Sequence, residues 1–227
     1  CIRDRIYTII LMISSFSLPL AVSRLVAERE YAGEVKNSYK VLICSLRFAA
    51  VTGGILSILT FLLGGVITKY VMGVELASYA LRVLAPAIFL FALTGVLRGF
   101  FQGHGTMVPT AVSQIIEQIF VATFALLMSH VFIQHFSATG DMDLVHRWGA
   151  AGATMGTGAG VASALIFMLI VYGVNRKIIR KRIVNDRHSV NESMGHVMSN
   201  IVLIIMPIIL SAFIYNVNGY INSYMYS

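Results

Sequence analysis

Residues 148–175 read WGAAGATMGTGAGVASALIFMLIVYGVN and carry no charged side chain. A helix rises about 1.5 Å per residue, so about 20 apolar residues cross the roughly 30 Å hydrocarbon core of a bilayer. Inside lipid the backbone must satisfy its own hydrogen bonds, which only helices and closed barrels achieve. The alternation of apolar and polar residues that marks a barrel strand is not visible. This stretch therefore predicts a membrane-spanning helix.

Five more stretches are nearly free of charge and at or near the length that a span requires. Hydrophobic residues make up 57% of the chain and charged residues only 12%, which would leave a soluble surface far too apolar. We therefore expect an all-α polytopic membrane protein with six transmembrane helices. The other five are Ile6–Ser23, Phe48–Thr68, Tyr79–Leu97, Val108–Gln134 and Val197–Ser227.

The basic residues gather in alternate gaps between these stretches: the first, the third and the fifth gap. The positive-inside rule places these gaps in the cytoplasm, so the first span runs inward from the outside. A formal charge of +7 also raises the possibility of nucleic-acid binding. Here, however, the cations stand in short loops, where they orient the protein and contact headgroups. We expect anionic membrane lipids as partners and no nucleic acid.

The order of the segments predicts a domain organisation. The chain has no initiator Met and opens almost inside a span, so we expect it to be part of a longer protein. Residues 1–175 would form an N-terminal lobe of five helices whose first helix is missing. Residues 176–196 would form a basic cytoplasmic linker that partly lies on anionic headgroups. Residues 197–227 would be the first helix of a second lobe.

Glu117 is the clearest ionisable residue inside a predicted span. A charge in lipid is expensive, so such a residue is a functional hypothesis by default. Thr110, Ser113, Gln114 and Glu117 share one helical face, which should point toward other helices or a water-filled cavity. The carboxylate either lines a path for cargo, pairs with an arginine for packing, or reaches toward the cytoplasmic interface.

Several arginines at predicted helix ends are candidates for a cationic cavity. Arg24 and Glu28 are spaced i, i+4, which permits a local ion pair. Alternatively, Arg24 faces a cavity, where its guanidinium would offer a bidentate fork to phosphate. Arg47 and Arg98 also stand at cytoplasmic helix ends. The other interpretation of all these arginines is topology and headgroup contact.

Two further patterns concern helix faces. Ser211, Tyr215, Asn218 and Asn222 form a polar stripe on the last span, which favours a hydrophilic path over interhelical hydrogen bonding alone. Gly152, Gly156 and Gly160 form a GxxxGxxxG run, and small residues at that spacing let helices approach closely. The glycine run predicts packing.

Neither a catalytic nor a metal-binding pattern is present in the sequence. Cys1 and Cys44 lack metal-ligand spacing, and His104 stands alone in a turn. Phosphate-cradling loops, nucleophile elbows and HExxH motifs are not found. We expect no enzyme activity, no cofactor and no metal.

Two segments resemble a known family. The first is LPLAVSRLVAE at residues 18–28, and the second is LRGFFQGHGTMVPTAVSQIIEQ at residues 97–118. Both resemble polysaccharide-biosynthesis flippases of the MurJ and SpoVB type, in the superfamily that includes the multidrug (MATE) transporters. The resemblance covers essentially the whole chain, as the second to seventh helices of that family.

The resemblance implies a transporter of the bacterial plasma membrane with about fourteen helices in two lobes. Its cargo would be an undecaprenyl-pyrophosphate-linked sugar such as lipid II, and cell-wall synthesis proteins are candidate partners. Some members carry two adjacent arginines near the end of the second helix, whereas this chain has Ser23-Arg24. Arg24 is the matching cavity position. The SpoVB likeness suggests a Gram-positive, spore-forming bacterium, with peptidoglycan biosynthesis and sporulation as the processes that the protein would serve.

Two other functions remain open on the sequence. A MATE-type drug or metabolite antiporter would share the layout but bind cations, whereas arginines favour anionic cargo. A scaffold in a cell-wall assembly would gain little from Glu117 or from the asparagine stripe. The sequence does not separate lipid II from other lipid-linked glycans.

Overall fold

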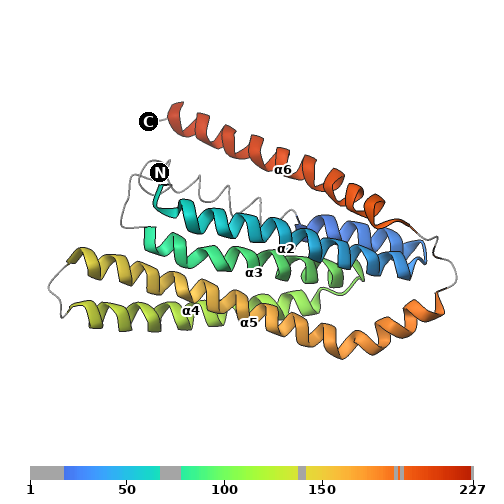
Figure 1. Ribbon diagram of the computed structural model, residues 1–227, viewed down its shortest axis with the longest axis horizontal. Helices are drawn as coiled ribbons and strands as arrows, with labels where there is room; N and C mark the ends of the chain where they lie inside the picture. The colour runs from blue at the N-terminus through green and yellow to red at the C-terminus, as the bar shows by residue number, and fades with distance from the viewer. Residues whose placement is uncertain (1–17, 67–77, 138–141, 187–188, 190–191, 226–227) are drawn as a thin grey trace. The chain divides into compact units, whose positions relative to one another are not determined.

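A computed structural model describes residues 18–66, 78–137, 142–186, 189 and 192–225. Every regular element within these ranges is a helix. Residues 18–31 form the first described helix, which we call helix 18–31. The labelled elements in Figure 1 are α2 (Val35–Val66), α3 (Ser78–Gly103), α4 (Val108–Ser137), α5 (Met142–Asn185) and α6 (Met194–Met225).

Four helices are long and apolar enough to cross a membrane, and a shorter apolar helix covers Met194–Ile208 at the start of α6. The prediction of an all-α, multi-pass membrane protein is confirmed. Residues 6–17 of the first predicted span lie outside the described residues. The four long apolar helices are Val35–Gly65, Tyr79–Gly103, Val108–Ser137 and Leu144–Asn185.

α2 and α5 extend furthest beyond the charge-free runs that predicted them. α2 begins at Val35, well before Phe48, and therefore contains Arg47 within its length. α5 continues past Asn175 to Asn185, so the first half of the predicted linker is helical. Freedom from charge marks only the part of a helix that lies in lipid. Lys and Arg are good helix formers, so the helix continues beyond it.

Two glycines form the sharp turns between consecutive helices. Gly33 separates helix 18–31 from α2 and has φ 76°, and Gly105 separates α3 from α4 and has φ 78°. Both values lie in the left-handed region that only glycine enters at little cost. At the first turn the Gly33 amide donates to the Glu30 carbonyl, at 3.1 Å. These turns let the helices on either side run antiparallel.

The chain divides into two compact units that cut across the helices. The first unit contains residues 1–49, 95–109 and 170–227, and it holds all three connections that the sequence places in the cytoplasm. Inside it, α3 packs closely on helix 18–31. A Cβ at Gly99 would stand 2.5 Å from the Pro19 carbonyl oxygen, and one at Gly103 would stand 2.6 Å from Val26.

The second unit contains residues 50–94 and 110–169, and its α4 and α5 run side by side (Figure 1). A Cβ at Gly152 would meet the Met128 backbone at 2.8 Å, and one at Gly156 would meet the Ala125 amide nitrogen at 2.5 Å. Gly160 approaches the Glu117 carbonyl oxygen, where a Cβ would stand 2.8 Å away. The packing predicted from the GxxxGxxxG run is confirmed.

An aromatic cluster lies at the start of α5 in this second unit. The Trp148 ring stacks on Phe136 with centroids 5.2 Å apart and an interplanar angle of 8°. Tyr79 and Phe132 approach the same ring at 5.5 and 5.6 Å. Trp and Tyr are enriched where a helix leaves the hydrocarbon. Such a cluster is typical of a helix end at a membrane interface.

Candidate functional site

Arg24 and Glu28 lie on the exposed side of helix 18–31. The opposite side is buried through Val22, Leu25 and Val26, which are at most 2% exposed. Although their spacing permits a local ion pair, Arg24 and Glu28 make none within the described part of the chain. The Arg24 guanidinium is therefore left available on a face that no described helix covers.

The other two arginine candidates differ from each other. Arg47 is exposed on α2, whereas Arg98 is half-buried near the end of α3 and interacts with other groups. All three arginines and Glu28 belong to the first unit. Their participation in a cargo cavity stays a prediction.

Glu117 belongs to the second unit and lies on the buried face of α4. Thr110, Ser113 and Glu117 are the buried residues of this helix, and the Ser113 hydroxyl donates to the Thr110 carbonyl at 2.7 Å. Gln114, the fourth residue of the expected polar face, is exposed instead. α4 thus turns Thr110, Ser113 and Glu117 inward, whereas most of its apolar residues are exposed, as expected of a membrane helix that faces lipid on one side.

Asn218 and Asn222 were predicted to line a path along the last span. Their backbone belongs to α6, but their side chains lie outside the described residues. α6 begins with a serine cap, because the Ser193 hydroxyl accepts a hydrogen bond from the His196 amide at 3.2 Å. Its buried face contains Val197, Ile201 and Ile205.

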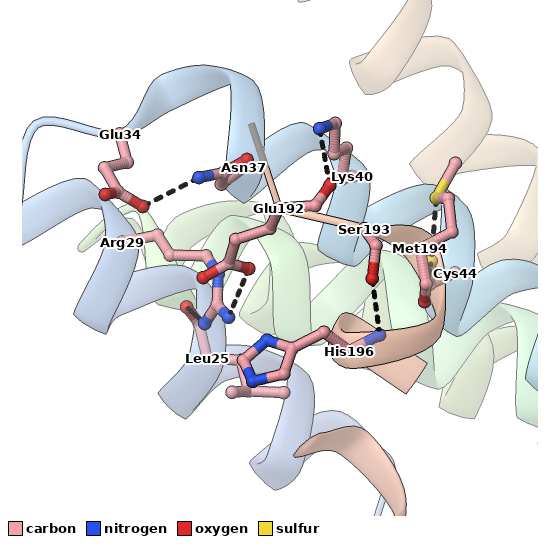
Figure 2. A network of polar contacts seen from close by, with 10 residues as sticks. All are labelled: Leu25, Arg29, Glu34, Asn37, Lys40, Cys44, Glu192, Ser193, Met194 and His196. Atoms are coloured by element: carbon pink, nitrogen blue, oxygen red, sulfur yellow. Dashed lines mark hydrogen bonds and ion pairs between the residues drawn. The ribbon is translucent and has the colours of Figure 1, made fainter. Parts of the chain in front are cut away.

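The start of α6 is held by a polar network around Arg29, shown in Figure 2. The Arg29 guanidinium donates to the Glu192 carboxylate at 2.9 Å and to the Leu25 carbonyl at 3.3 Å. Lys40 donates from Nζ to the Glu192 backbone carbonyl at 2.9 Å. Arg29 is only 6% exposed, so this pairing compensates the guanidinium for the water it has lost. We call Arg29, Lys40 and Glu192 the Arg29 network.

Glu30 connects the α3–α4 turn with the end of α5. One carboxylate oxygen lies 3.2 Å from His104 Nε2 in the α3–α4 turn. The other accepts a hydrogen bond from Arg182, near the end of α5, at 2.6 Å. His104, which the sequence leaves without a role, therefore contacts a carboxylate far away in the sequence.

Asp186 caps the N-terminus of α2 from a distant part of the chain. Its Oδ2 accepts a hydrogen bond from the Lys36 amide at 2.8 Å, and its backbone carbonyl accepts one from Lys36 Nζ at 2.8 Å. Ser189 donates to the same carboxylate through its amide and its hydroxyl. A carboxylate at this position satisfies an orphan amide and complements the helix dipole.

An open cleft of about 580 Å³ lies beside this cap. It is lined by Gly33, Val35, Ile178, Lys181, Arg182, Asn185 and Asp186. The lining combines cationic side chains with one buried carboxylate that is already bonded to Lys36. Groups of three or more potential metal ligands do not occur among the residues that the structure describes.

Arg29, Glu30, Asp186 and Glu192 were not among the functional residues predicted from the sequence. Their partners are about 70 to 160 residues away in the chain, so no local spacing reveals them. One signal was available: Asp186 and Glu192 are acidic residues in the otherwise basic segment 176–196. An acidic residue that stands among many basic ones is a candidate for an ion pair.

Comparisons with known proteins identify the family of this chain. A family model described as "Polysaccharide biosynthesis protein" matches residues 5–227. Stage V sporulation protein B of Bacillus subtilis (strain 168) is 26% identical over 209 residues, covering 92% of this chain and 38% of that protein. No solved structure is significantly similar to the chain.

Two further relatives come from the same organism. Lipid II flippase MurJ is 28% identical over 169 residues, covering 71% of this chain and 31% of that protein. Uncharacterized membrane protein YabM is 32% identical over 160 residues, covering 70% of this chain and 28% of that protein. The chain thus spans about a third of the length of these relatives.

Proposed function

The chain belongs to the polysaccharide biosynthesis protein family, and on that basis we propose that the full-length protein is a lipid-linked glycan flippase. It would move an undecaprenyl-pyrophosphate-linked sugar precursor, lipid II or a related intermediate, from the cytoplasmic to the outer leaflet. The relative named as a lipid II flippase supports this class of cargo. A flippase moves its cargo without making or breaking a covalent bond, so the proposed function requires no enzyme activity.

The observation that carries the proposal is the position of Arg24. Among the described residues, Arg24 is exposed on helix 18–31, in a segment expected at the cytoplasmic side, with Glu28 one turn further on. A pyrophosphate is the part of the cargo that lipid excludes most strongly. A guanidinium can bind two of its oxygens at once, which offsets part of the lost hydration.

The proposed mechanism is alternating access between two lobes. Residues 1–175 would belong to the first lobe, residues 176–196 would connect the lobes, and α6 would open the second. The cavity would take up the pyrophosphate and sugar from the cytoplasm, while the lipid tail stays in the bilayer. Rocking of the lobes would then expose the headgroup to the outside. The barrier that the protein lowers is the desolvation of that headgroup.

The test is complementation by the full-length gene in a bacterium depleted of its lipid II flippase. We expect rescue by the unchanged gene, loss of rescue with Arg24→Ala, and at least partial rescue with Arg24→Lys, which keeps the charge. Tyr31→Ala is the matched control, because Tyr31 is 97% exposed at the end of the same helix.

Immunoblots of the membrane fraction would show that each variant is inserted. Failure of a well-inserted, unchanged protein to rescue would exclude lipid II as the cargo. Efflux of cationic drugs by that same protein would favour the antiporter alternative. Rescue by Arg24→Ala at the level of the unchanged protein would remove Arg24 from the cargo site.

A further inference from the structure

The last cytoplasmic part of α5 carries a dense group of cations. Five of the seven residues from Arg176 to Arg182 are basic, and none is acidic. The structure places all of them on a continuous helix that also contains the charge-free span. The cations therefore follow the charge-free span without a break in the helix.

α5 itself indicates where these cations stand in a bilayer. Its aromatic cluster around Trp148 marks the interface at one end. At about 1.5 Å per residue, the helix rises about 42 Å from Trp148 to Arg176. A bilayer with its headgroup layers is about 40–45 Å thick. Arg176 and the residues after it therefore reach the headgroup layer on the cytoplasmic side.

Among the residues that the structure describes, four of the five cations differ from the fifth in their partners. Arg182 is bound to Glu30 at 2.6 Å, and elsewhere in the same unit Lys36, Lys40 and Arg29 all donate to protein oxygens. By contrast, no hydrogen bond or ion pair of the other four is found within the described ranges. The nearby carboxylates of Glu30 and Asp186 already have partners. The four are Arg176, Lys177, Arg180 and Lys181, all exposed.

The surroundings of these cations suit a lipid. Val174 and Ile178, one turn apart on α5, are 73% and 61% exposed, which fits contact with acyl chains. The cleft of about 580 Å³ is lined by Ile178, Lys181 and Asn185, so an apolar side chain and a cation meet at one recess. A headgroup could occupy this recess while its tails run along the apolar side of the helix.

We propose that Arg176, Lys177, Arg180 and Lys181 form a binding surface for the headgroups of anionic phospholipids. The surface is distinct from Arg24 and does not depend on the proposed transport function. Its occupant is a membrane phospholipid with a net negative charge, because such a lipid brings a phosphate to the cations and acyl chains to Val174 and Ile178. Each Lys or Arg that lies near an anionic membrane surface adds to the electrostatic attraction between the protein and the lipid headgroups.

The test uses the full-length protein purified in detergent, with lipid adducts counted by native mass spectrometry. Phosphatidylglycerol is the probe, and phosphatidylcholine, which carries a phosphate but no net charge, is the reference lipid. We expect the unchanged protein to prefer phosphatidylglycerol. Replacing all four cations by glutamine should reduce that preference by about tenfold or more.

Two control variants separate charge from fold. Arg176→Lys with Arg180→Lys keeps every charge and should keep the preference. Arg182→Gln removes a cation that is bound to Glu30 and should change the preference little. An unchanged preference in the fourfold glutamine variant would overturn the proposal, as would its loss in the charge-retaining variant.

Salt dependence gives a second measurement that needs no variant. Lipid phosphate held by exposed cations should be displaced as ionic strength rises. Phosphatidylglycerol adducts on the unchanged protein that persist equally in low and high salt would contradict the proposal, even if the glutamine variant failed to insert.

Discussion

Buried ionisable side chains have different origins in this molecule. Arg29 and Asp186 are buried because each meets a partner from a distant segment. Glu117 is buried on a helix whose other faces are mostly apolar and exposed. An acidic group held inside a membrane protein is a strong candidate for a role in transport.

Glu117→Gln should abolish complementation while leaving the amount of inserted protein unchanged, because it removes the charge but keeps the shape. Glu117→Ala should also lower stability, since losing a buried polar partner costs about 1–3 kcal/mol. Gln114→Ala, at an exposed position on the same helix, is the control. Full activity of Glu117→Gln in the depletion strain would show that the charge serves packing alone.

The cap that Asp186 supplies to α2 makes a second prediction at a single residue. Asp186→Ala removes the acceptor for the Lys36 amide and should destabilise the protein by about 1 kcal/mol, as for other helix caps. Asn185→Ala changes the exposed neighbouring residue and should have little effect. Thermal unfolding of the purified full-length protein measures both. Equal melting temperatures for the two variants would contradict the cap.

Glycine spacing determines how closely the helices approach one another. On α5, Gly156 faces the α4 backbone, whereas a Cβ at Gly158 would have no neighbouring atom within 4 Å. Gly156→Ala should therefore force the two helices apart and cost about 1–3 kcal/mol. Gly158→Ala should be neutral or slightly stabilising, because alanine favours the helix.

Melting temperatures of the two alanine variants, measured in the same detergent, provide the comparison. A Gly156→Ala protein as stable as Gly158→Ala would mean that α4 and α5 are not in close contact. The two positions are two residues apart on one helix, so differences in insertion cannot explain a difference in stability.

At the scale of helices, the sequence predicted position well and length poorly. Charge-free runs located each long apolar helix that the structure describes, because exclusion of charge is what lipid demands. They missed the start of α2 and the end of α5, where the helix extends beyond the apolar run. The run Gly95, Gly99 and Gly103 has the same spacing as the α5 glycines, and α3 uses it against helix 18–31. That signal is present in the sequence, although no packing was predicted from it.

Across the whole molecule, the contacts that join distant segments could not be predicted. Arg29 and Glu192 are 163 residues apart, and nothing in either neighbourhood specifies the other. From the sequence, Arg29 is expected to be one of several exposed basic residues in the first gap between spans. In the structure its side chain is buried. Pairing of this kind depends on the folded arrangement of helix 18–31, α2 and α6, which periodicity alone does not give.

The Arg29 network attaches the start of α6 to helix 18–31, and its strength can be measured with charge reversals. Arg29→Glu places two carboxylates together, and Glu192→Arg places two guanidiniums together, so each should destabilise the full-length protein. Loss of one partner of a buried pair costs about 3–5 kcal/mol, and less here because the Glu192 side chain is 24% exposed. The double variant restores opposite charges and should recover part of the loss. We expect a coupling of about 0.5–3 kcal/mol in thermal unfolding.

In the proposed flippase α6 is the first helix of the second lobe, so the double variant should also recover part of the activity in complementation. Purely additive effects of the two reversals would mean that Arg29 and Glu192 do not act as a pair.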